Sequence, residues 1–520
     1  MSWEPELDEL RRREELARRM GGEERVERQR ASGRLTVRER IERLFDHGTF
    51  HETGALAGKA TYGDDGEIED FLPANVVIGS GRIEGRRAVV QGDDFTVRGG
   101  AADAAIWQKM VYAERMAHDL RLPLVRLVDG TGGGGSVKTL EQTGFSYVPP
   151  LPGFDVVVKN SAIVPVVAAA LGPVAGLGAA RVVCSHFAVI VKDTAQLFVA
   201  GPPVVAAAMG ESPDKEELGG SRAQARAGAV DNVAADEDDA LDQIRRFLSY
   251  LPDNVWEAPP GQAASDPADR REEELLAVVP RDRRRPYKMR RVLDLVLDAG
   301  SLFELGPRYG RPLITALARL GGRPVGVLAS DPEHYGGGLT ADASEKLARF
   351  VDLCDQFHLP VVNFVDQPGF VIGTAAERAG TIRRGARALY AVHQATVPWV
   401  SILVRKVYGV AGAGHGDGSR LNQRDAWPSG DWGSLPIEGG LEAAYRRELE
   451  AAEDPERLRA EIAARLDAVR SPFRTAERFS VEEIIDPRDT RVLLCDWAER
   501  AHELVRHELH DGPKSRGPRP

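Results

Sequence analysis

Two stretches of the chain repeat the same order of apolar runs and segments in which apolar and polar residues are interspersed. Each begins with an apolar run typical of a buried strand, at 87–91 and 325–329. A glycine-rich loop follows, then a segment whose apolar residues recur three and four positions apart, then a second short apolar run. The pattern predicts strand, helix and strand in each copy. Because the strands are apolar throughout, we expect a parallel sheet covered by helices, with ligands at the carboxyl ends of its strands.

The two stretches also match residue by residue. GRRAVVQGDDFTVRGG at 85–100 aligns with GRPVGVLASDPEHYGG at 322–337, an offset of 237 positions. Farther along, Val-Ala-Gly at 174–176 is paired with Val-Ala-Gly at 410–412, at a slightly smaller offset. Dispersed glycine, proline and aspartate matches at one offset are improbable by chance. The sequence therefore predicts an α/β protein built from two homologous halves.

A segment rich in proline, glycine and charge separates the halves, a composition typical of an exposed connection. We expect an N-terminal domain with a charged helical leader at 1–265 and a linker at 266–285. A C-terminal domain should occupy 286–509, followed by a disordered tail at 510–520. In the leader, Thr36-x-x-Glu39 resembles a capping box and predicts the start of a helix.

Composition excludes several classes of function. The formal net charge of −11 and the isoelectric point near 5.6 disfavour a general affinity for nucleic acid or an anionic membrane. The longest apolar run, 163–183, is interrupted by proline and glycine, unlike a membrane span. The first residues lack the apolar core of a secretory signal, so a cytoplasmic location is expected. The 3 cysteines lie far apart, and no metal site is expected.

Four glycine-rich loops follow apolar strands, two in each half, and there an anionic group could meet backbone N–H donors. The first loop matches GxGxxG at 130–135, but a run of glycines satisfies that motif trivially and the second half lacks it, which disfavours a dinucleotide site. Two other loops could stabilise negative charge on an oxygen atom, and tight strand–helix packing is the alternative explanation. The candidate substrate-binding residues are Gly132, Gly133, Gly134, Gly172, Gly369 and Gly409.

The sequence has no clear motif for a side-chain nucleophile or a metal site. No GxSxG, HExxH or Walker A motif is present. His415 lies in a glycine-rich loop and could act as an acid or base, but we expect it to be a bystander. The absence of an evident nucleophile favours a reaction governed by positioning and electrostatics.

A series of motifs resembles the carboxyltransferase (β) subunits of biotin-dependent acyl-CoA carboxylases, the propionyl-CoA carboxylase type especially. In the order of that family, the chain has DDFTVRGG (93–100), GPVAGLGAA (172–180), FVDQPGFVIGT (364–374), VRKVYGVAG (404–412) and AWPSGDWG (426–433). The resemblance implies two tandem crotonase-like domains related by internal duplication. It also implies a homohexamer whose active sites lie between the N-terminal domain of one chain and the C-terminal domain of another.

The resemblance further implies a mechanism and its residues. Carboxybiotin would give CO₂ to the α-carbon of an acyl-CoA. The backbone amides of Gly176 and Leu177 would hold the thioester enolate, and those of Val410 and Ala411 the ureido oxygen of biotin. Leu177 and Val410 replace glycines that the family usually has. The chain carries no AMKM-like biotinyl-lysine motif and no biotin carboxylase ATP-binding domain, so a biotin carboxylase and a biotin carboxyl carrier subunit are the expected partners.

Other functions remain open from the sequence. The same site could run in reverse, as a biotin-dependent acyl-CoA decarboxylase or a transcarboxylase. A carrier-independent crotonase-type hydratase or isomerase would need well-placed carboxylates for proton transfer. A non-catalytic paralogue that only holds a complex together is a further alternative.

Overall fold

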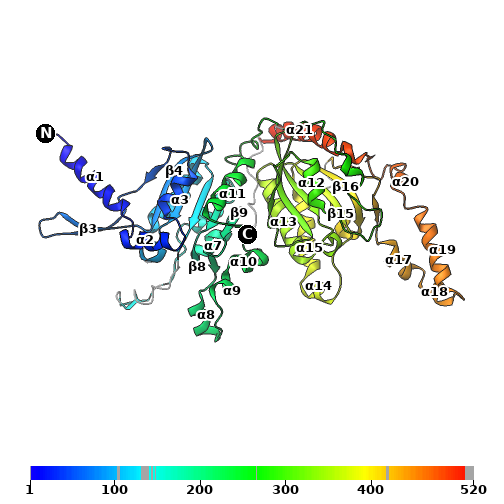
Figure 1. Ribbon diagram of the computed structural model, residues 1–520, viewed down its shortest axis with the longest axis horizontal. Coiled ribbons are helices and arrows are strands. Elements are labelled where there is room, and N and C mark those ends of the chain that lie inside the picture. Colours follow the sequence, from blue (N-terminus) through cyan, green and yellow to red (C-terminus); the bar gives the residue numbers. More distant parts are fainter. Residues whose placement is uncertain are drawn as a thin grey trace. The chain divides into compact units, whose positions relative to one another are not determined.

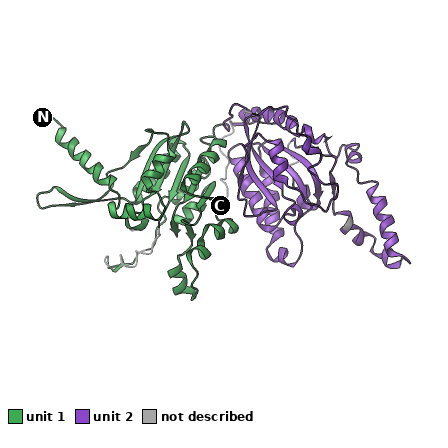
Figure 2. Ribbon diagram, viewed as in Figure 1, with its two compact units in different colours: residues 1–257, 513–518, 520 green, residues 258–512, 519 purple. Residues whose placement is uncertain are grey.

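The chain forms two compact units in the computed structural model (Figure 2). The structure describes residues 2–101, 106–130, 140–141, 144–146, 148–264, 266–416 and 421–509. Unit 1 extends to Glu257 and unit 2 begins at Ala258. The segment 266–285, expected as a linker, belongs to unit 2, where Leu275 lies in the hydrophobic core. The expected tail at 510–520 lies outside the described residues.

A seven-stranded mixed sheet forms the centre of unit 1 (Figure 1). Its order is β1-β4-β5-β6-β7-β9-β11, antiparallel as far as β5 and parallel from there on. The strands are β1 (His51–Thr53), β4 (Val76–Ile83), β5 (Arg86–Asp93), β6 (Leu124–Val128), β7 (Val166–Ala170), β9 (Phe187–Val191) and β11 (Asn232–Ala234). Strands β6, β7 and β9 are buried throughout, as expected for a parallel sheet covered on both faces.

Two smaller strand pairs accompany this sheet. Strands β8 (Pro173–Ala175) and β10 (Gln196–Phe198) are parallel, and β2 (Gly58–Tyr62) and β3 (Ile68–Pro73) form an antiparallel hairpin. The helices of unit 1 are α1 (Glu4–Arg18), α2 (Glu23–Ala31), α3 (Val37–Leu44), α4 (Trp107–Leu120), α6 (Phe154–Asn160), α7 (Leu177–Val183), α8 (Pro202–Met209), α9 (Lys215–Gly219), α10 (Ser221–Ala227) and α11 (Glu237–Tyr250).

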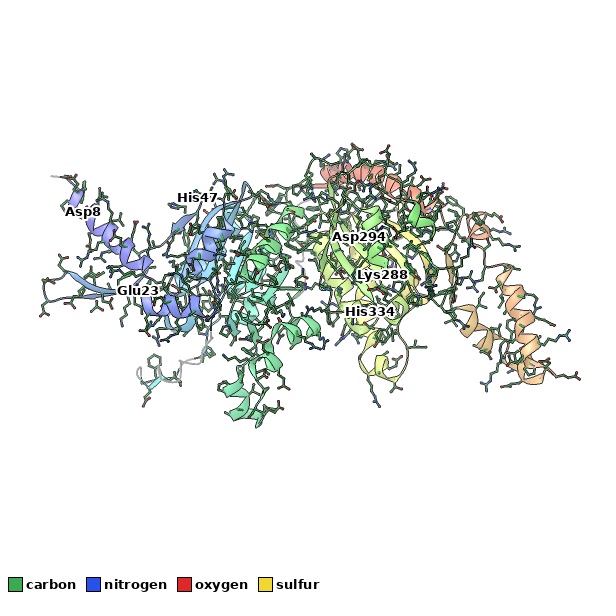
Figure 3. All side chains as sticks on the ribbon, viewed as in Figure 1. Asp8, Glu23, His47, Lys288, Asp294 and His334 are labelled. Carbon is green, nitrogen blue, oxygen red and sulfur yellow. The ribbon has the colours of Figure 1, made fainter. Side chains whose placement is uncertain are left out.

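The N-terminal leader is helical, as its charge pattern predicts. The capping box at the start of α3 is present, because Thr36 and Glu39 bond each other's backbone N–H groups. Many charged side chains of α1 and α2 face solvent, among them Asp8 and Glu23 (Figure 3).

Unit 2 is built on a second mixed sheet, of order β12-β13-β14-β15-β16-β17-β19, with β18 paired to β16. Pairing is again antiparallel as far as β14 and parallel beyond it. The strands are β12 (Phe303–Leu305), β13 (Leu313–Leu320), β14 (Arg323–Ser330), β15 (Val361–Gln367), β16 (Trp399–Tyr408), β17 (Gln423–Ala426), β18 (Asp431–Gly433) and β19 (Glu483–Ile484).

The helices of unit 2 are α12 (Met289–Val296), α13 (Ala341–Gln356), α14 (Thr374–Arg378), α15 (Thr381–Gln394), α16 (Gly409–Ala413), α17 (Ile437–Ala444), α18 (Arg446–Ala451), α19 (Pro455–Asp467), α20 (Pro472–Ala476) and α21 (Thr490–Glu508). Some of them pack on its sheet, whereas α17, α18 and α19 pack on one another and extend away from it (Figure 1). Helices α12 and α21 contribute to one core with β13, β14 and β16. No helix within the described ranges is long and apolar enough to cross a membrane.

The two sheets share one topology, and their registers keep the offset found in the sequence. Gln91 pairs with Arg126 in unit 1, and Leu328 pairs with Asn363 in unit 2. Both members of the second pair lie 237 positions after those of the first. The predicted α/β architecture with parallel central strands is therefore confirmed.

Beyond the central strands the offset changes, and one pairing made from the sequence is wrong. Leu124 pairs with Val166 in unit 1 and Val361 with Trp399 in unit 2, so the offset has fallen to 233. The counterpart of Gly176 is therefore Gly409, and both have a φ of 61°. The match of 174–176 with 410–412 is a coincidence of small residues, and it misplaces the second turn by three positions.

A buried acid on β17 gives a stability prediction. The Asp425 side chain is 1% exposed, and within the described chain its Oδ1 has no hydrogen-bond partner. Burial raises the pKa of Asp425, and Glu483 and Glu482 raise it further. A raised pKa means that the folded state prefers the protonated acid, so stability is lost as pH rises through the carboxyl's range.

We therefore expect Asp425→Asn to raise the free energy of unfolding at pH 7 by about 1 kcal/mol. The advantage should vanish below the ordinary carboxyl pKa, about 3.9, where the wild-type acid is protonated in both states. Thermal unfolding of the two proteins at both pH values measures this difference. A variant that is less stable than the wild type at pH 7 would contradict the expectation.

Candidate functional site

The turn after β8 places a glycine and a short helix at the end of the parallel strands. Gly176 leaves β8 in the left-handed region, and α7 begins at Leu177. The N–H of Gly176 donates to the carbonyl oxygen of Phe198 at 3.3 Å, which extends the β8–β10 pairing. The first N–H groups of a helix have no intrahelical acceptor. Of the predicted pair, Leu177 therefore has an N–H group available to a ligand, whereas the N–H of Gly176 is already bonded to Phe198.

The turn after β16 has the same construction. Gly409 takes the left-handed conformation and Val410 follows it, with a side chain 63% exposed, while Ala411 is buried. Gly369 lies beside this turn, since a side chain added there would contact the carbonyl oxygen of Tyr408 at 3.7 Å. The structure thus brings Gly369 and Gly409 together.

Gly172 is explained by packing. A side chain at this position would overlap the carboxylate of Asp129 and the guanidinium of Arg34. The missing side chain therefore makes room for an ion pair of the protein itself. The other predicted binding glycines of this half, at 132–134, lie outside the described residues.

Asp129 lies at the end of the central strand of unit 1 and is neutralised by the leader. Its Oδ2 is 2.9 Å from Nη1 of Arg40, and its Oδ1 is 3.1 Å from Nη1 of Arg34. Arg40 also binds Glu237, with 2.6 Å between Nε and Oε2, and neither Arg40 nor Asp129 is exposed. Burial opposes the charge on Arg40, but Asp129 and Glu237 hold its pKa above the usual value.

Asp366 is the counterpart of Asp129, but the cation that pairs with it lies on strand β16 rather than on the N-terminal leader. Nε of Arg405 lies 3.0 Å from Oδ2 of Asp366, and the backbone N–H of Lys406 donates to Oδ1 at 3.0 Å. At the offset of β16, Arg405 corresponds to Gly172. Asp129 and Asp366 keep the offset of 237, but sequence reasoning missed the arginines that pair with them. The available signal was an aspartate ending an apolar strand in both halves.

A buried lysine recurs at the offset of 237, as Lys109 in unit 1 and Lys346 in unit 2. Nζ of Lys346 donates to the carbonyl oxygens of Gly306 and Leu313, each at 2.8 Å. Lys109, its counterpart, has Nζ 3.9 Å from Oε1 of Glu52. Burial lowers the pKa of Lys109 to about 8, although Glu52 opposes the shift. Each lysine is a buried side chain that connects a helix, α4 or α13, to the strands of its sheet.

His415 is held by its own loop. Its Nδ1 lies 2.7 Å from the carbonyl oxygen of Gly412, so this nitrogen is the donor. Burial lowers the pKa of His415 and so favours the neutral ring, although the bond to Gly412 opposes the shift. That the imidazole takes no part in chemistry stays a prediction.

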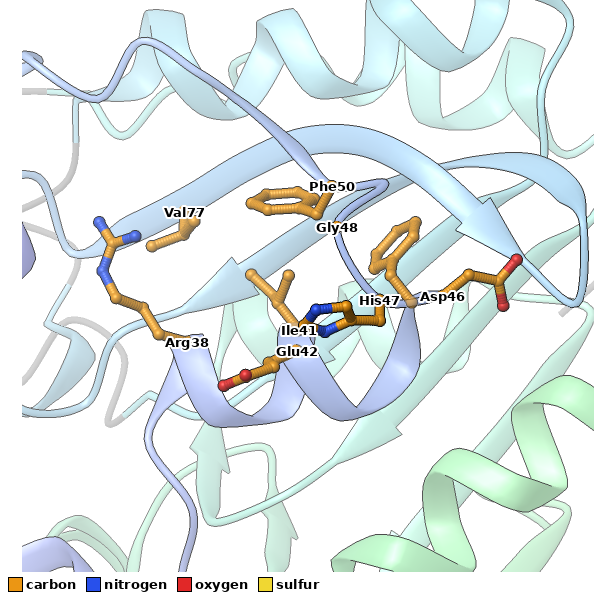
Figure 4. A pocket seen from close by; sticks show the side chains of 9 residues that line it. Arg38, Ile41, Glu42, Asp46, His47, Gly48, Phe50 and Val77 are labelled. Carbon is orange, nitrogen blue, oxygen red and sulfur yellow. The ribbon is translucent and has the colours of Figure 1, made fainter.

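A cavity of about 210 Å³ lies on another part of unit 1, between α3 and β4 (Figure 4). Ile41, Phe45 and Phe50 give it apolar walls, and charged side chains of α3 stand at its rim. None of the predicted site residues lines it. In the described parts of the chain, no group of three or more His, Cys, Asp or Glu side chains could hold a metal ion. At the two glycine turns, main-chain N–H groups could stabilise negative charge on an oxygen atom.

Comparisons with known proteins point to one family. The sequence profile of the carboxyl transferase domain matches residues 28–509. A propionyl-CoA carboxylase carboxyltransferase subunit of Haloferax mediterranei is 36% identical over 497 residues, 94% of this chain and 95% of the relative. The methylmalonyl-CoA decarboxylase subunit alpha of Veillonella parvula is 34% identical, covering 91% of each chain.

Solved structures give the same result. A crystal structure of transcarboxylase 12S, described as a hexamer with methylmalonyl-coenzyme A and methylmalonic acid bound, superimposes with a TM-score of 0.86. It is 33% identical in sequence, and the alignment covers 96% of each chain.

Proposed function

Because the chain belongs to the carboxyl transferase domain family, we propose that it moves a carboxyl group from carboxybiotin to the α-carbon of an acyl-CoA. The match to residues 28–509 carries this conclusion, since it spans both units. The family identified from the motifs is thereby confirmed, and the chain is a carboxyltransferase. The sequence's alternatives, a decarboxylase or transcarboxylase and a carrier-independent hydratase or isomerase, are not the functions that these findings favour.

The substrate that we propose is a short acyl-CoA such as propionyl-CoA. Relatives named propionyl-CoA carboxylase at 34–36% identity support it, as does the methylmalonyl-coenzyme A bound to transcarboxylase 12S. The two units would be tandem crotonase-like domains derived by duplication, the first ending at Glu257 and the second beginning at Ala258. Their shared sheet order supports a common origin.

Backbone amides would carry the chemistry. Carboxybiotin, when delivered by its carrier, supplies the carboxyl group. In unit 1, the turn at Gly176 and Leu177 would hold the thioester oxygen as negative charge develops on it. In unit 2, the turn at Val410 and Ala411 would hold the ureido oxygen of biotin. The chain fits this role because a left-handed glycine at the start of each turn, Gly176 or Gly409, leaves it without a side chain there. Neither site needs a side-chain nucleophile.

We propose that six copies of the chain assemble, together with a biotin carboxylase and a biotin carboxyl carrier subunit. Helix α8 supports the self-assembly, because its sequence PPVVAAAM is apolar and none of its residues is buried. It extends away from the sheet of unit 1 (Figure 1), with Val204 57% and Met209 71% exposed. An apolar helix in this state is typical of a surface that a partner covers.

Incorporation of labelled bicarbonate tests the proposal. The purified chain, supplied with an active biotin carboxylase, a biotinylated carrier and ATP, should form a carboxylated acyl-CoA, with the highest rate on a short acyl chain. Omission of the chain should abolish incorporation. Failure across acetyl-, propionyl-, butyryl- and longer acyl-CoA, with partners shown to be active on their own substrates, would contradict the proposed function.

A further inference from the structure

A buried arginine in unit 1 joins the central strand to the far end of α7. Nη1 of Arg126, on β6, donates to the carbonyl oxygens of Arg181 at 3.1 Å and Cys184 at 2.8 Å. Its Nε and Nη2 donate to the two carboxylate oxygens of Glu114, at 2.9 and 3.0 Å. Arg126 is fully buried and Glu114 nearly so. The Arg126–Glu114 ion pair is thus hydrogen-bonded to the carbonyl end of α7, the helix that begins at Leu177.

In unit 2, the segment that follows helix α16 is bonded by a side chain at the corresponding position of the central strand. Asn363 on β15 is the register counterpart of Arg126. Its Nδ2 donates to the carbonyl oxygen of His415 at 2.9 Å, and the same oxygen accepts from Nε1 of Trp399 at 2.9 Å and Oγ of Ser401 at 3.0 Å. Three donors exceed the two lone pairs of a carbonyl, so its acceptor capacity is fully used.

These bonds matter because the helices they hold are short. Helix α7 has 7 residues and α16 has 5, and helices of such length are not stable by themselves. The place of their first turn therefore depends on what fixes the rest of the segment to the sheet. Stabilisation of an oxyanion requires donors that are held in place before the reaction. A displacement of about 1 Å can cost about 10²-fold in rate.

We propose that Arg126 in unit 1, and Asn363, Trp399 and Ser401 in unit 2, are positioning residues for the carboxyl transfer reaction. Each set anchors the carbonyl end of a short helix to the central strands and so keeps the amides of its first turn in place. None of these side chains touches substrate in this scheme. The inference rests on the proposed function, because the two turns are the amide sites assigned there.

The test in unit 1 removes the anchor while it keeps the buried charges balanced. Arg126→Met alone would leave Glu114 buried without the cation that pairs with it, and could prevent folding. The double variant Glu114→Gln/Arg126→Met removes both charges. We expect its kcat to fall by about 10- to 100-fold, with a smaller change in KM for the acyl-CoA. Arg126→Lys keeps a cation beside Glu114 but not the full set of guanidinium bonds, so its kcat should lie between those of the wild type and the double variant.

Arg86 provides a matched control within unit 1. It pairs with Asp253 through Nε at 2.9 Å and donates to the carbonyl oxygen of Leu248, near the end of α11, at 2.6 Å. Arg86→Met therefore removes the same kinds of bond from a helix that carries no proposed site. It should reduce thermal stability and leave kcat near the wild-type value. An equal loss of kcat in this control would overturn the positioning role.

In unit 2, Asn363→Leu/Ser401→Ala leaves Trp399 as the single donor to His415, and we expect a similar fall in kcat. Amide hydrogen exchange locates each effect without reference to activity. Exchange at 180–184, where the N–H groups of Ala180 and Cys184 are hydrogen-bonded within the segment, should become faster only in the unit 1 double variant. Exchange at 414–415, where both N–H groups bond to the preceding turn, should become faster only in the unit 2 variant. Unchanged exchange in both would overturn the inference. If the unaltered protein transfers no carboxyl group, the proposed function fails, while the exchange result still decides whether the anchors hold the turns.

Discussion

Leu177→Pro and Val410→Pro should each lower kcat by about 10²- to 10³-fold, the usual cost of deleting one oxyanion donor. Each replacement removes one N–H at the residue that follows a left-handed glycine, Gly176 or Gly409. Proline is well tolerated at the start of a helix, because the N–H it lacks has no intrahelical partner there. Initial rates of carboxyl transfer with saturating acyl-CoA measure the loss, and thermal unfolding checks that the fold is kept.

Alanine variants are the controls for this experiment. Leu177→Ala and Val410→Ala keep the N–H and remove most of the side chain, so kcat should stay within a few-fold of the wild type. Gly176→Pro is unsuitable as a test, because proline cannot adopt the φ of 61° found there. Full activity of both proline variants would contradict the assignment of these turns.

Arg40→Met is expected to cost about 3–5 kcal/mol of stability, the usual penalty for breaking a buried ion pair from one side. The substitution leaves Asp129 and Glu237 buried without the guanidinium that binds both. Chemical denaturation followed by the fluorescence of unit 1 should show an earlier transition. Because Asp129 immediately precedes a predicted binding loop, carboxyl transfer should fall as well.

Arg43 supplies the comparison on the same helix. Its ion pair with Asp238 is exposed, with 48% and 61% of the two side chains accessible. Exposed pairs of this kind contribute about 0–1 kcal/mol. Arg43→Met should therefore be nearly neutral. Equal effects of the two substitutions would show that burial of the Arg40 network does not govern its contribution.

The fold was predictable to the extent that local pattern and repetition carry it. Apolar runs that lie on both sides of a helical segment specify a parallel sheet, because both faces of its strands must be buried. The capping box of Thr36 and Glu39 was predictable for the same local reason, since both partners lie within one helical turn. Family motifs added the identity of the reaction class.

The site was less accessible to sequence reasoning. The glycines of its turns were found, but that Gly172 makes room for Arg34 and Asp129 was visible only in the structure. The register of the second turn was also misplaced, because Val-Ala-Gly recurs three residues beyond the true counterpart of Gly176. Small residues repeat too often for a short match to determine structural equivalence.

The sequence by itself determined that the chain has two like halves, an α/β sheet in each, glycine turns at the strand ends and membership of one family. Only the tertiary structure decided which cation neutralises each buried aspartate and what anchors each amide turn. Arg40 and Asp129 are far apart in the chain, as are Arg405 and Asp366, and no periodicity connects them. A buried charge must be paired wherever a cation can reach it, so its partner is determined by distance in the fold rather than by order in the chain.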